Sequence, residues 1–293
     1  MCLMVKLLLT ILVYHQALGE SNEIAPGVYS FISDGSCVSL FVLTGQGVLV
    51  IEPCNSFHSS KMLQAIQELS AEPISHLFIS HNHWDHASGS QVFKNVGATI
   101  VAHDYAYQYL MATPGPDTLV PDETWSGNYT KYSQGNTNLE LFYFGASHGV
   151  GMTAFLLPDT KIAYMADTVS PNSVGFATLP DFDINGWELT LTKYLELDFE
   201  TAIFSHNAYP EPLKGGGKED VLLMIEYIQD IRVGIYDEIE KGTFPFLIPS
   251  ILKLPKYEHL ANYDEFLAMN IWAILLQEPF AIGPFLSGPR YQD

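Results

Sequence analysis

HNHWDH, at residues 81–86, places three of the chain's ten histidines within six residues. A buried imidazole needs partners for both ring nitrogens, so a cluster of histidines calls for a chemical reason. The run before it, PISHLFIS (73–80), is rich in apolar residues and predicts a buried strand. His81 and His83 follow that strand two residues apart, so in an extended chain both rings can point the same way.

The second half of this stretch predicts a change of direction. Asp85 and His86 are adjacent, and adjacent side chains point apart unless the backbone turns. The sequence WDHASGSQVFKN (84–95) favours a helix, whose first turn would bring both side chains to a second point close to the first. Imidazole nitrogen and carboxylate oxygen are ligands of Zn²⁺. One short loop can therefore serve two metal ions.

The pattern His81-x-His83-x-Asp85-His86 resembles the signature of the metallo-β-lactamase superfamily. The later motifs of that family can be found in order along the chain. GASHGVGMT supplies His148, IAYMADTV supplies Asp167 at the end of a strand, and AIFSHN supplies His206. All of the family's ligand positions are therefore filled, within residues 28–206.

This resemblance implies an α/β fold, a four-layer αββα sandwich with two metal ions at one edge between the β-sheets. By the resemblance, the first ion is bound by His81, His83 and His148, the second by Asp85, His86 and His206, and Asp167 bridges them. An aspartate at the bridging position looks like the glyoxalase II and lactonase branches, whereas some β-lactamases have cysteine or serine there. Two places depart from the family pattern: Glu52-Pro53-Cys54 stands where Asp-x-Gly is usual, and Ser205 precedes the last histidine in place of glycine.

The composition predicts an acidic protein with a substantial core. The 293 residues are 47% hydrophobic and 13% aromatic, and the formal net charge is -20. Such a field disfavours nucleic acid and anionic membranes as partners and attracts cations, so we expect a small-molecule substrate. No break in composition divides residues 20–293, which predicts a single domain with a motif-bearing core at 28–206 and a mainly helical part at 215–293.

Residues 1–19 predict a cleaved signal peptide and hence a secreted protein. Lys6 precedes an apolar run at 7–13, and the small residues Ala17 and Gly19 come before the first acid. The apolar run is far shorter than the roughly 20 residues that span a bilayer, so no membrane anchor is expected, although an uncleaved N-terminal helix is an alternative. Asn128-Tyr129-Thr130 is a sequon for N-glycosylation.

Cys37 and Cys54 flank two β-rich runs joined by TGQG (44–47), which predicts a hairpin turning at Gly45-Gln46. With Thr44 facing Gly47, Cys37 falls opposite Cys54, and we predict a disulfide between them. Two buried free thiols are the alternative, because a register shift of one residue would separate the cysteines.

The remaining pattern predicts an alternation of helices and strands with one long loop. A helix is expected at 59–70, with Met62, Leu63, Ile66 and Leu69 on one face behind a serine cap. Further helices are expected at 105–111, 187–197 and 263–277, and the chain after His206 is expected to be mainly helical as far as about residue 241. Strands are expected at 98–103, 138–145, 153–159, 161–167 and 201–205. Residues 113–137 are expected to form a long loop.

The histidine and aspartate motifs, with the family resemblance, predict a hydrolase with two Zn²⁺ ions per chain. In this reaction a metal-bound hydroxide would attack the carbonyl of a small ester, thioester, lactone or lactam. Fe²⁺ or Mn²⁺ are alternative metals. Asp85 is the expected proton-handling residue. The alternatives are a phosphodiesterase or an iron-dependent oxygenase on the same ligands, and a non-catalytic secreted metal-binding module.

Aromatic residues in the loops are candidates for pocket walls. These are Trp125, Tyr129 and Tyr132 and the segment 171–182, unless they pack their own loops instead. The other histidines, His58, His76, His103 and His259, are expected to be structural or at the surface. Of these, only His103 ends a strand placed like the metal loops, and it is a weaker candidate for lining the site.

Overall fold

The computed structural model describes residues 19–33, 35 and 37–281, so almost all of the predicted signal peptide lies outside the described residues. The strands are β1 (Glu20–Ala25), β2 (Val28–Ile32), β3 (Val38–Leu43), β4 (Val48–Ile51), β5 (Ile74–Phe78), β6 (Thr99–His103), β7 (Glu123–Trp125), β8 (Tyr129–Gln134), β9 (Thr137–Phe142), β10 (Ala154–Leu157), β11 (Ile162–Tyr164) and β12 (Thr201–Ile203). The α-helices are α2 (Ser56–Leu69), α3 (Trp84–Ala87), α4 (Ser90–Lys94), α5 (Asp104–Ala112), α6 (Ile184–Glu196), α7 (Lys218–Glu240), α8 (Ile248–Ile251) and α9 (Tyr263–Gln277). Short 3-10 turns lie at Pro212–Lys214, Pro245–Leu247 and Pro255–Tyr257.

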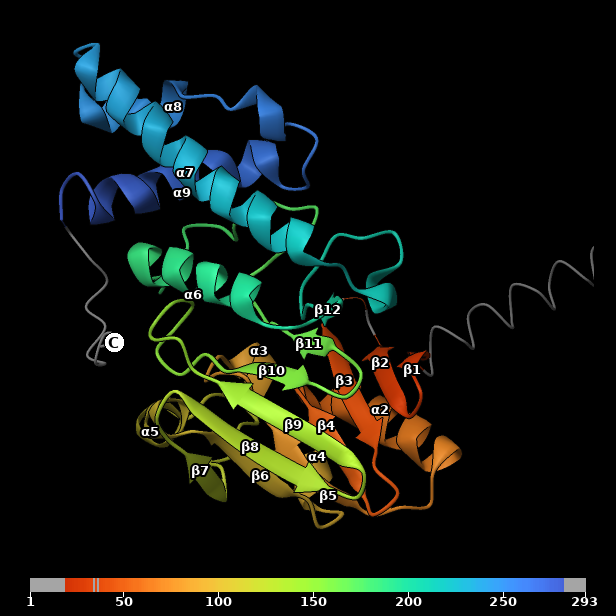
Figure 1. Ribbon diagram of the computed structural model, residues 1–293. Helices are drawn as coiled ribbons and strands as arrows, with labels where there is room; N and C mark the ends of the chain where they lie inside the picture. Colours follow the sequence, from red (N-terminus) through yellow and green to blue (C-terminus); the bar gives the residue numbers. More distant parts are fainter. Residues whose placement is uncertain (1–18, 34, 36, 282–293) are drawn as a thin grey trace, which may run out of the picture.

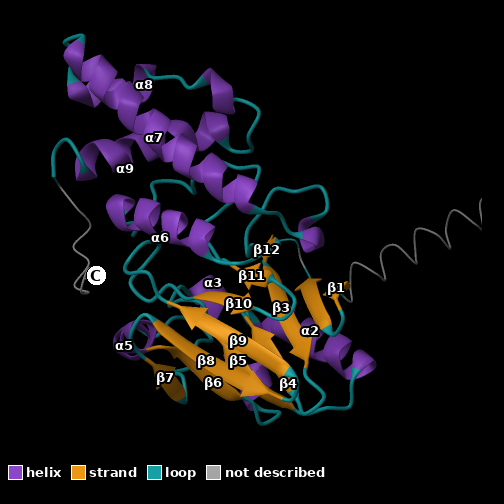
Figure 2. Ribbon diagram, viewed as in Figure 1, coloured by secondary structure: helices purple, strands orange, loops and turns teal. Residues whose placement is uncertain are grey.

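The described strands form two sheets (Figures 1 and 2). The first has the order β1-β2-β3-β4-β5-β6-β7, antiparallel as far as β4 and parallel from β4 to β7. The second has the order β12-β11-β10-β9-β8, in which only the β11–β12 pair is parallel. Parallel neighbours need crossover connections, and helices α2 and α6 supply two of them.

Three apolar clusters separate four layers. Leu40 and Phe78 of the first sheet meet Phe155 of the second sheet in the central cluster. On the outer face of the first sheet, a cluster includes Met62 and Ile66 from α2. On the outer face of the second sheet, a third cluster packs α6, α7 and α9 on that sheet. The two sheets are thus flanked by helices, which confirms the α/β fold class and the αββα arrangement.

The hairpin of β3 and β4 has the predicted register. Phe41 pairs with Val50 and Leu43 with Val48. This is the register that follows when Thr44 faces Gly47. In that register Cys37 and Cys54 come together, and their sulfur atoms are bonded, with the Cα atoms 6.3 Å apart. The structure therefore has the disulfide rather than two free thiols.

The helix expected at 84–95 is in fact two short helices. Gly89 separates α3 from α4 with a φ of 80°, and a Cβ built there would lie 2.5 Å from the backbone of Asn55. The left-handed backbone conformation interrupts the helix, and the close approach of Asn55 leaves room only for glycine at this position. Helix α2 also begins earlier than expected, because the side chain of Asn55, rather than a serine, caps it by accepting from the N–H of His58. Leu69 was expected on the buried face of this helix but is 46% exposed.

The long loop expected at 113–137 is wrong, because this segment contributes β7 and β8. Two of its aromatic residues, which were candidates for the walls of a pocket, pack on other parts of the fold instead. Trp125 is buried against the ring of His103, and Tyr132 packs on Phe78 in the space between the sheets. Gly, Asn and Ser in this segment mark its turns, whereas pairing with neighbouring strands decides that the residues between the turns are extended.

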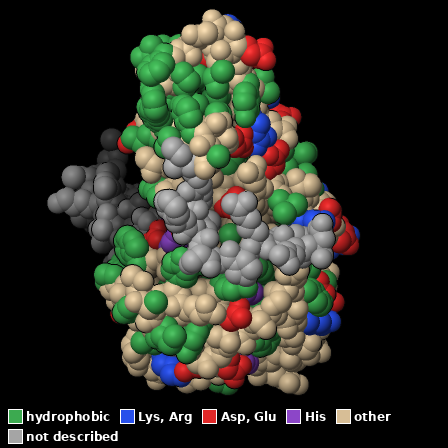
Figure 3. All heavy atoms as spheres, turned by 90° about the vertical axis from the view of Figure 1, so that its left-hand side faces the viewer, with side chains coloured by type: hydrophobic (Ala, Val, Ile, Leu, Met, Phe, Trp, Pro, Cys, Tyr) green, Lys and Arg blue, Asp and Glu red, His purple; other side chains and the backbone are tan. Residues whose placement is uncertain are grey.

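The helical part at the C-terminal end covers the second sheet. Arg232 of α7 bonds to Glu188 of α6 and to Glu278 at the end of α9, which ties these helices together. In the space-filling view, hydrophobic side chains gather over the upper part of the face shown, where this helical layer lies (Figure 3). Among the described residues, no helix combines the length and the apolar character that crossing a bilayer requires.

Candidate metal centre

The seven residues expected as metal ligands come from five segments that meet at one end of the sheets. His81 and His83 follow β5, and Asp85 and His86 lie on α3. His148 lies between β9 and β10, Asp167 follows β11, and His206 follows β12. The carboxyl ends of β5, β11 and β12 thus deliver most of these side chains, and the structure brings all seven together.

The first cluster contains His81, His83, His148 and Asp167, with one ligand atom of each within 4.8 Å of the others. The facing atoms His83 Nδ1 and His148 Nε2 are 2.9 Å apart, and His148 Nε2 is 3.3 Å from Asp167 Oδ2. His81 Nε2 is buried without a hydrogen-bond partner and lies 3.9 Å from the same carboxylate oxygen. Converging ring nitrogens with an unpartnered buried atom among them fit a bound cation.

The second cluster contains Asp85, His86 and His206. The Nε2 atoms of His86 and His206 are 3.1 Å apart, and Asp85 Oδ2 lies 3.6 Å from the first and 3.7 Å from the second. Asp167 also reaches this cluster, because its Oδ2 is 3.1 Å from His86 Nε2 and its Oδ1 is 3.7 Å from His206 Nε2. Asp167 therefore contacts both clusters and has the position of a bridging ligand.

Burial and charge separate the protonation states within the site. Burial lowers the pKa of His81 well below its usual value and also lowers the pKa of His148, which favours neutral rings with a lone pair. Burial alone would lower the pKa of His86, but the carboxylate of Asp167 outweighs it and holds that pKa well above the usual value. Correspondingly, the imidazoles of His86 and His206 outweigh burial and hold the pKa of Asp167 well below its usual value. A bound cation would replace the proton of His86 and be paired with the same carboxylate.

The outward nitrogens of three of these rings face polar groups that can orient them. Ser80 Oγ lies 2.8 Å from His81 Nδ1, and Asp181 Oδ2 lies 2.6 Å from His83 Nε2. Glu52 Oε2 lies 3.4 Å from His86 Nδ1, so Glu52 also groups with His81 and His86 as a possible ligand set. Such contacts to the second ring nitrogen fix the orientation of a ligating histidine.

The sequence analysis did not identify either of the two supporting carboxylates, Glu52 and Asp181, as a residue of the site. Glu52 stands where the family pattern has aspartate, so that departure was itself the signal for a carboxylate near the ligands. Asp181 belongs to the segment 171–182, which was expected to border the site, but nothing in the local sequence separates it from Asp183. Phe182, in the same segment, packs its ring on His148 at a centroid distance of 4.3 Å.

Gly149, which follows His148, has a backbone conformation that favours glycine. Its φ is 72°, and a Cβ built there would meet Asp181 Oδ2 at 3.4 Å and His83 Nε2 at 3.8 Å. These are ordinary contact distances, so an alanine would fit in the space but would be strained by its backbone conformation. The positive φ is therefore the structural reason for a glycine at this position.

His103 has a structural role, as expected for most of the other histidines. Its Nδ1 accepts from the backbone N–H of Tyr105 at 3.2 Å, so its Nε2 carries the hydrogen donated to the carbonyl of Gly127 at 3.2 Å. Burial lowers the pKa of His103, which agrees with a neutral ring. The ring also stacks on Tyr143, so its contacts lie within the core rather than at the metal ligands.

Comparison with known proteins places this geometry in a family. The alpha subunit of a 2,4-dinitroanisole O-demethylase from Nocardioides sp. (strain JS1661) is 28% identical over 273 residues, which cover 87% of this chain and 81% of that protein. A metallo-beta-lactamase from Pontibacter korlensis has a similar fold, with a TM-score of 0.63 and 18% identity over 72% of this chain and 99% of that one. A stereoselective inverting sec-alkylsulfatase from Pseudomonas sp. gives a TM-score of 0.69 at 17% identity over 91% of this chain, which spans only 52% of that protein.

The sequence profile of the metallo-beta-lactamase superfamily matches residues 32–206. This range contains all seven of the clustered residues and both supporting carboxylates. The chain belongs to the metallo-β-lactamase superfamily.

Proposed function

We propose that this protein is a dinuclear metal-dependent hydrolase of small molecules. The observation that carries the proposal is the convergence of two ligand clusters on one carboxylate, with Asp167 within 3.3 Å of His148 in one cluster and 3.1 Å of His86 in the other. We assign His81, His83 and His148 to the first ion and Asp85, His86 and His206 to the second, with Asp167 between them.

The donor set fits Zn²⁺, and Fe²⁺ or Mn²⁺ are the alternatives, because imidazole and carboxylate suit all three ions. When bound, two such ions lower the pKa of a coordinated water toward ~7 and polarise the bond that is attacked. Asp181 orients His83 and Glu52 orients His86, so that the inward nitrogens of both rings stay aimed at the centre.

Asp85 is our candidate for proton handling. Its side chain is 41% exposed, whereas the side chain of Asp167 is 12% exposed, so Asp85 is the carboxylate of the centre that solvent and substrate can reach. It can take the proton of the attacking water at a carboxylate oxygen and return it to the leaving group. Phe182 covers the ring of His148 from another side and limits access of water there.

We propose a carbonyl group of an ester, thioester, lactone or lactam as the bond attacked. The relative named as a 2,4-dinitroanisole O-demethylase subunit favours a second candidate, an activated aryl methyl ether. Hydrolysis of such an ether adds water across a carbon–oxygen bond and yields a phenol and methanol. Oxidative demethylation would instead consume O₂ and yield formaldehyde.

The test combines elemental analysis of the purified protein with chromogenic lactam, lactone, thioester, phosphodiester and 2,4-dinitroanisole substrates. We expect about two metal ions per chain and turnover of at least one carbonyl or ether substrate under anaerobic conditions. A strict requirement for O₂ would establish the oxygenase alternative. Hydrolysis of only the phosphodiester would establish a phosphodiesterase. A metal-loaded protein without turnover of any substrate would favour a binding module.

We also propose that the protein is secreted after cleavage near residue 19. Two observations support this: the buried Cys37–Cys54 disulfide, which is typical of an oxidising compartment, and the exposed position of Asn128 in its sequon. N-terminal sequencing of protein recovered from the medium of secreting cells should find a start near Glu20. Glycosidase treatment should lower its mass, and an Asn128→Gln variant should show no such change.

A further inference from the structure

The segment around Cys54 supports His86 of the second cluster. Cys54 forms a parallel backbone bridge with Ala87, the residue that follows His86. Two residues before Cys54, the carboxylate of Glu52 approaches the outward nitrogen of His86. The backbone of this short segment therefore sets where the imidazole of His86 lies.

This segment has an unfavourable backbone conformation. Glu52 has a φ of 74° and Cys54 a φ of 59°, in the left-handed region that favours glycine. Cys54 occupies the place where the family pattern has glycine. Something other than intrinsic preference must hold the segment, and two contacts with β3 do so: the disulfide to Cys37, and the hydrogen bond of 2.6 Å from Ser39 Oγ to the carbonyl of Glu52.

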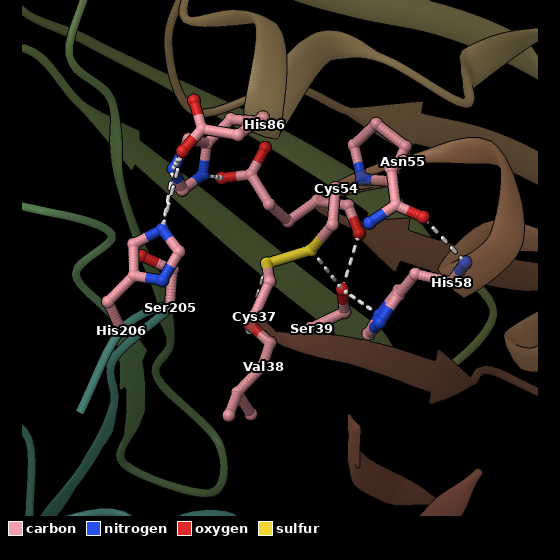
Figure 4. Close-up of a disulfide and its surroundings, with 12 residues drawn as sticks. Cys37, Val38, Ser39, Cys54, Asn55, His58, His86, Ser205 and His206 are labelled. Atoms are coloured by element: carbon pink, nitrogen blue, oxygen red, sulfur yellow. Dashed lines mark hydrogen bonds and ion pairs between the residues drawn. A yellow bond between two sulfur atoms is a disulfide. The ribbon is translucent and has the colours of Figure 1, made fainter. Parts of the chain in front are cut away.

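The other end of the disulfide supports His206. Val38, next to Cys37, donates its N–H to the carbonyl of Ser205 at 2.8 Å, and Ser205 immediately precedes His206. The hydroxyl of Ser205 donates to Asp167 Oδ1 at 2.5 Å. Figure 4 shows the disulfide with His86 and His206 beside it. The cross-link thus joins two segments, each of which contacts the backbone beside one of these histidines.

We propose that the Cys37–Cys54 disulfide positions the ligands of the second metal ion, so that its loss weakens binding of that ion selectively. The proposal rests on the dinuclear centre proposed above. The first cluster has two contacts of its own, Ser80 with His81 and Asp181 with His83. It shares with the second cluster Asp167 and the carboxylate of Glu52, whose Oε1 lies 3.4 Å from the backbone nitrogen of Ser80. Both cysteines are buried, at 2% and 0% exposure, so their effect acts through position rather than through direct contact with substrate.

The test is a stepwise Co²⁺ titration of the metal-free, full-length secreted protein, followed by visible absorption and elemental analysis. It compares oxidised protein with protein reduced by a phosphine, with alkylation and mass spectrometry counting the thiols. Reduction adds two electrons and two protons to the disulfide, and the phosphine becomes its oxide with oxygen from water. We expect the first Co²⁺ to bind both forms alike, and the second to bind the reduced form about 10- to 100-fold more weakly.

Two double variants test the same point without a reductant. Cys37→Ser with Cys54→Ser removes the cross-link and should weaken the second ion as reduction does. Cys37→Ser with Cys54→Gly should regain part of that affinity, because glycine adopts the left-handed conformation without help. A merely structural loss would not be repaired by removing a buried side chain. Ile66→Ala is the matched control, because Ile66 is a buried apolar side chain of α2 that belongs to neither metal-ligand cluster.

The outcomes separate this inference from the proposal on which it rests. Oxidised protein that binds fewer than two ions would refute the dinuclear centre and this inference with it. Two ions bound by oxidised protein, with equal affinities after loss of the cross-link, would overturn this inference alone. Equal weakening of both ions, matched by Ile66→Ala, would also overturn it by showing a general loss of stability. Selective loss of the second ion with partial rescue by glycine would support it.

Discussion

The two ligand clusters of the candidate centre reach similar geometry by different means. In the first cluster, the side chains of His81 and His148 are 0% and 6% exposed. In the second, the side chains of Asp85 and His206 are 41% and 35% exposed. The first cluster is held by burial and by polar side chains behind its rings. The second is open to solvent at Asp85 and His206, whereas its His86 is fully buried, and it is backed by backbone segments joined through a disulfide. Access from solvent is therefore greatest on the side of the second cluster.

Removing a ligand from each cluster would break this division most directly. His148→Ala should lower the content of the first ion from about one per chain to near zero and abolish most activity, because a site with one fewer ligand binds its metal far less tightly. His206→Ala should release the second ion and leave the first. Elemental analysis with Co²⁺ spectra measures both. Release of both ions by either variant would mean that the clusters do not act as separate sites.

The charge of the exposed carboxylate should matter more for rate than for folding. Asp85→Asn should lower kcat by about 10²-fold or more, because an amide cannot take a proton from water. Circular dichroism and thermal unfolding should change little, since Asp85 is partly exposed. Elemental analysis is the necessary control, as Asp85 is also an assigned ligand. Full activity of the variant with two ions bound would remove Asp85 from the mechanism.

The supporting carboxylates sharpen the comparison, because Asp181 faces a ring of the first cluster and Glu52 faces a ring of the second. Asp181→Asn should weaken the first ion about 10- to 100-fold and spare the second, and Glu52→Gln should do the reverse. Both substitutions keep the size of the side chain and remove only its charge. Competition with a chelator of known affinity measures each site. If each variant weakened both ions equally, Asp167 would couple the clusters too strongly for them to be distinguished.

A substitution in the helical layer supplies a contrast with both clusters, because it should affect stability slightly and metal binding not at all. Arg232→Gln should cost about 1–2 kcal/mol of unfolding free energy and leave both metal affinities unchanged, because Arg232 ties helices together far from the ligands. Burial raises the pKa of Glu188, but the hydrogen bond from Arg232 outweighs it and lowers that pKa below the ordinary value of 4.5. This stabilisation is therefore present above about pH 4.5 and is lost as the pH falls through the lowered pKa.

Denaturant unfolding at pH 7 and near pH 4 measures this effect. The difference in stability between the native protein and the Arg232→Gln variant should be largest at pH 7 and should shrink on acidification. A constant difference would mean that the packing of the arginine stem, rather than its ion pairs, stabilises the layer.

Local pattern was sufficient for most of the ligand set and the core elements. His81, His83 and His86 are recognisable because their spacing is rare, and β3 and β4 because two β-rich runs flank a glycine turn. The hairpin also predicted the disulfide, with two free thiols as the alternative, and the register found in the structure decided between them. In contrast, β7 and β8 were missed because their sequence is polar and rich in turn residues, and pairing with the neighbouring strands β6 and β9 makes them extended.

The same limit applies within the site. The sequence by itself indicated which side chains could bind metal, through the spacing within residues 81–86 and, for His148, Asp167 and His206, through the family resemblance. It did not determine which outer carboxylates orient those side chains: Asp181 reaches His83 across 98 residues, and α2 and β5 lie between Glu52 and His86 in the sequence. Only the tertiary structure decided those partners, because ring orientation depends on contacts between segments that folding alone brings within hydrogen-bond distance.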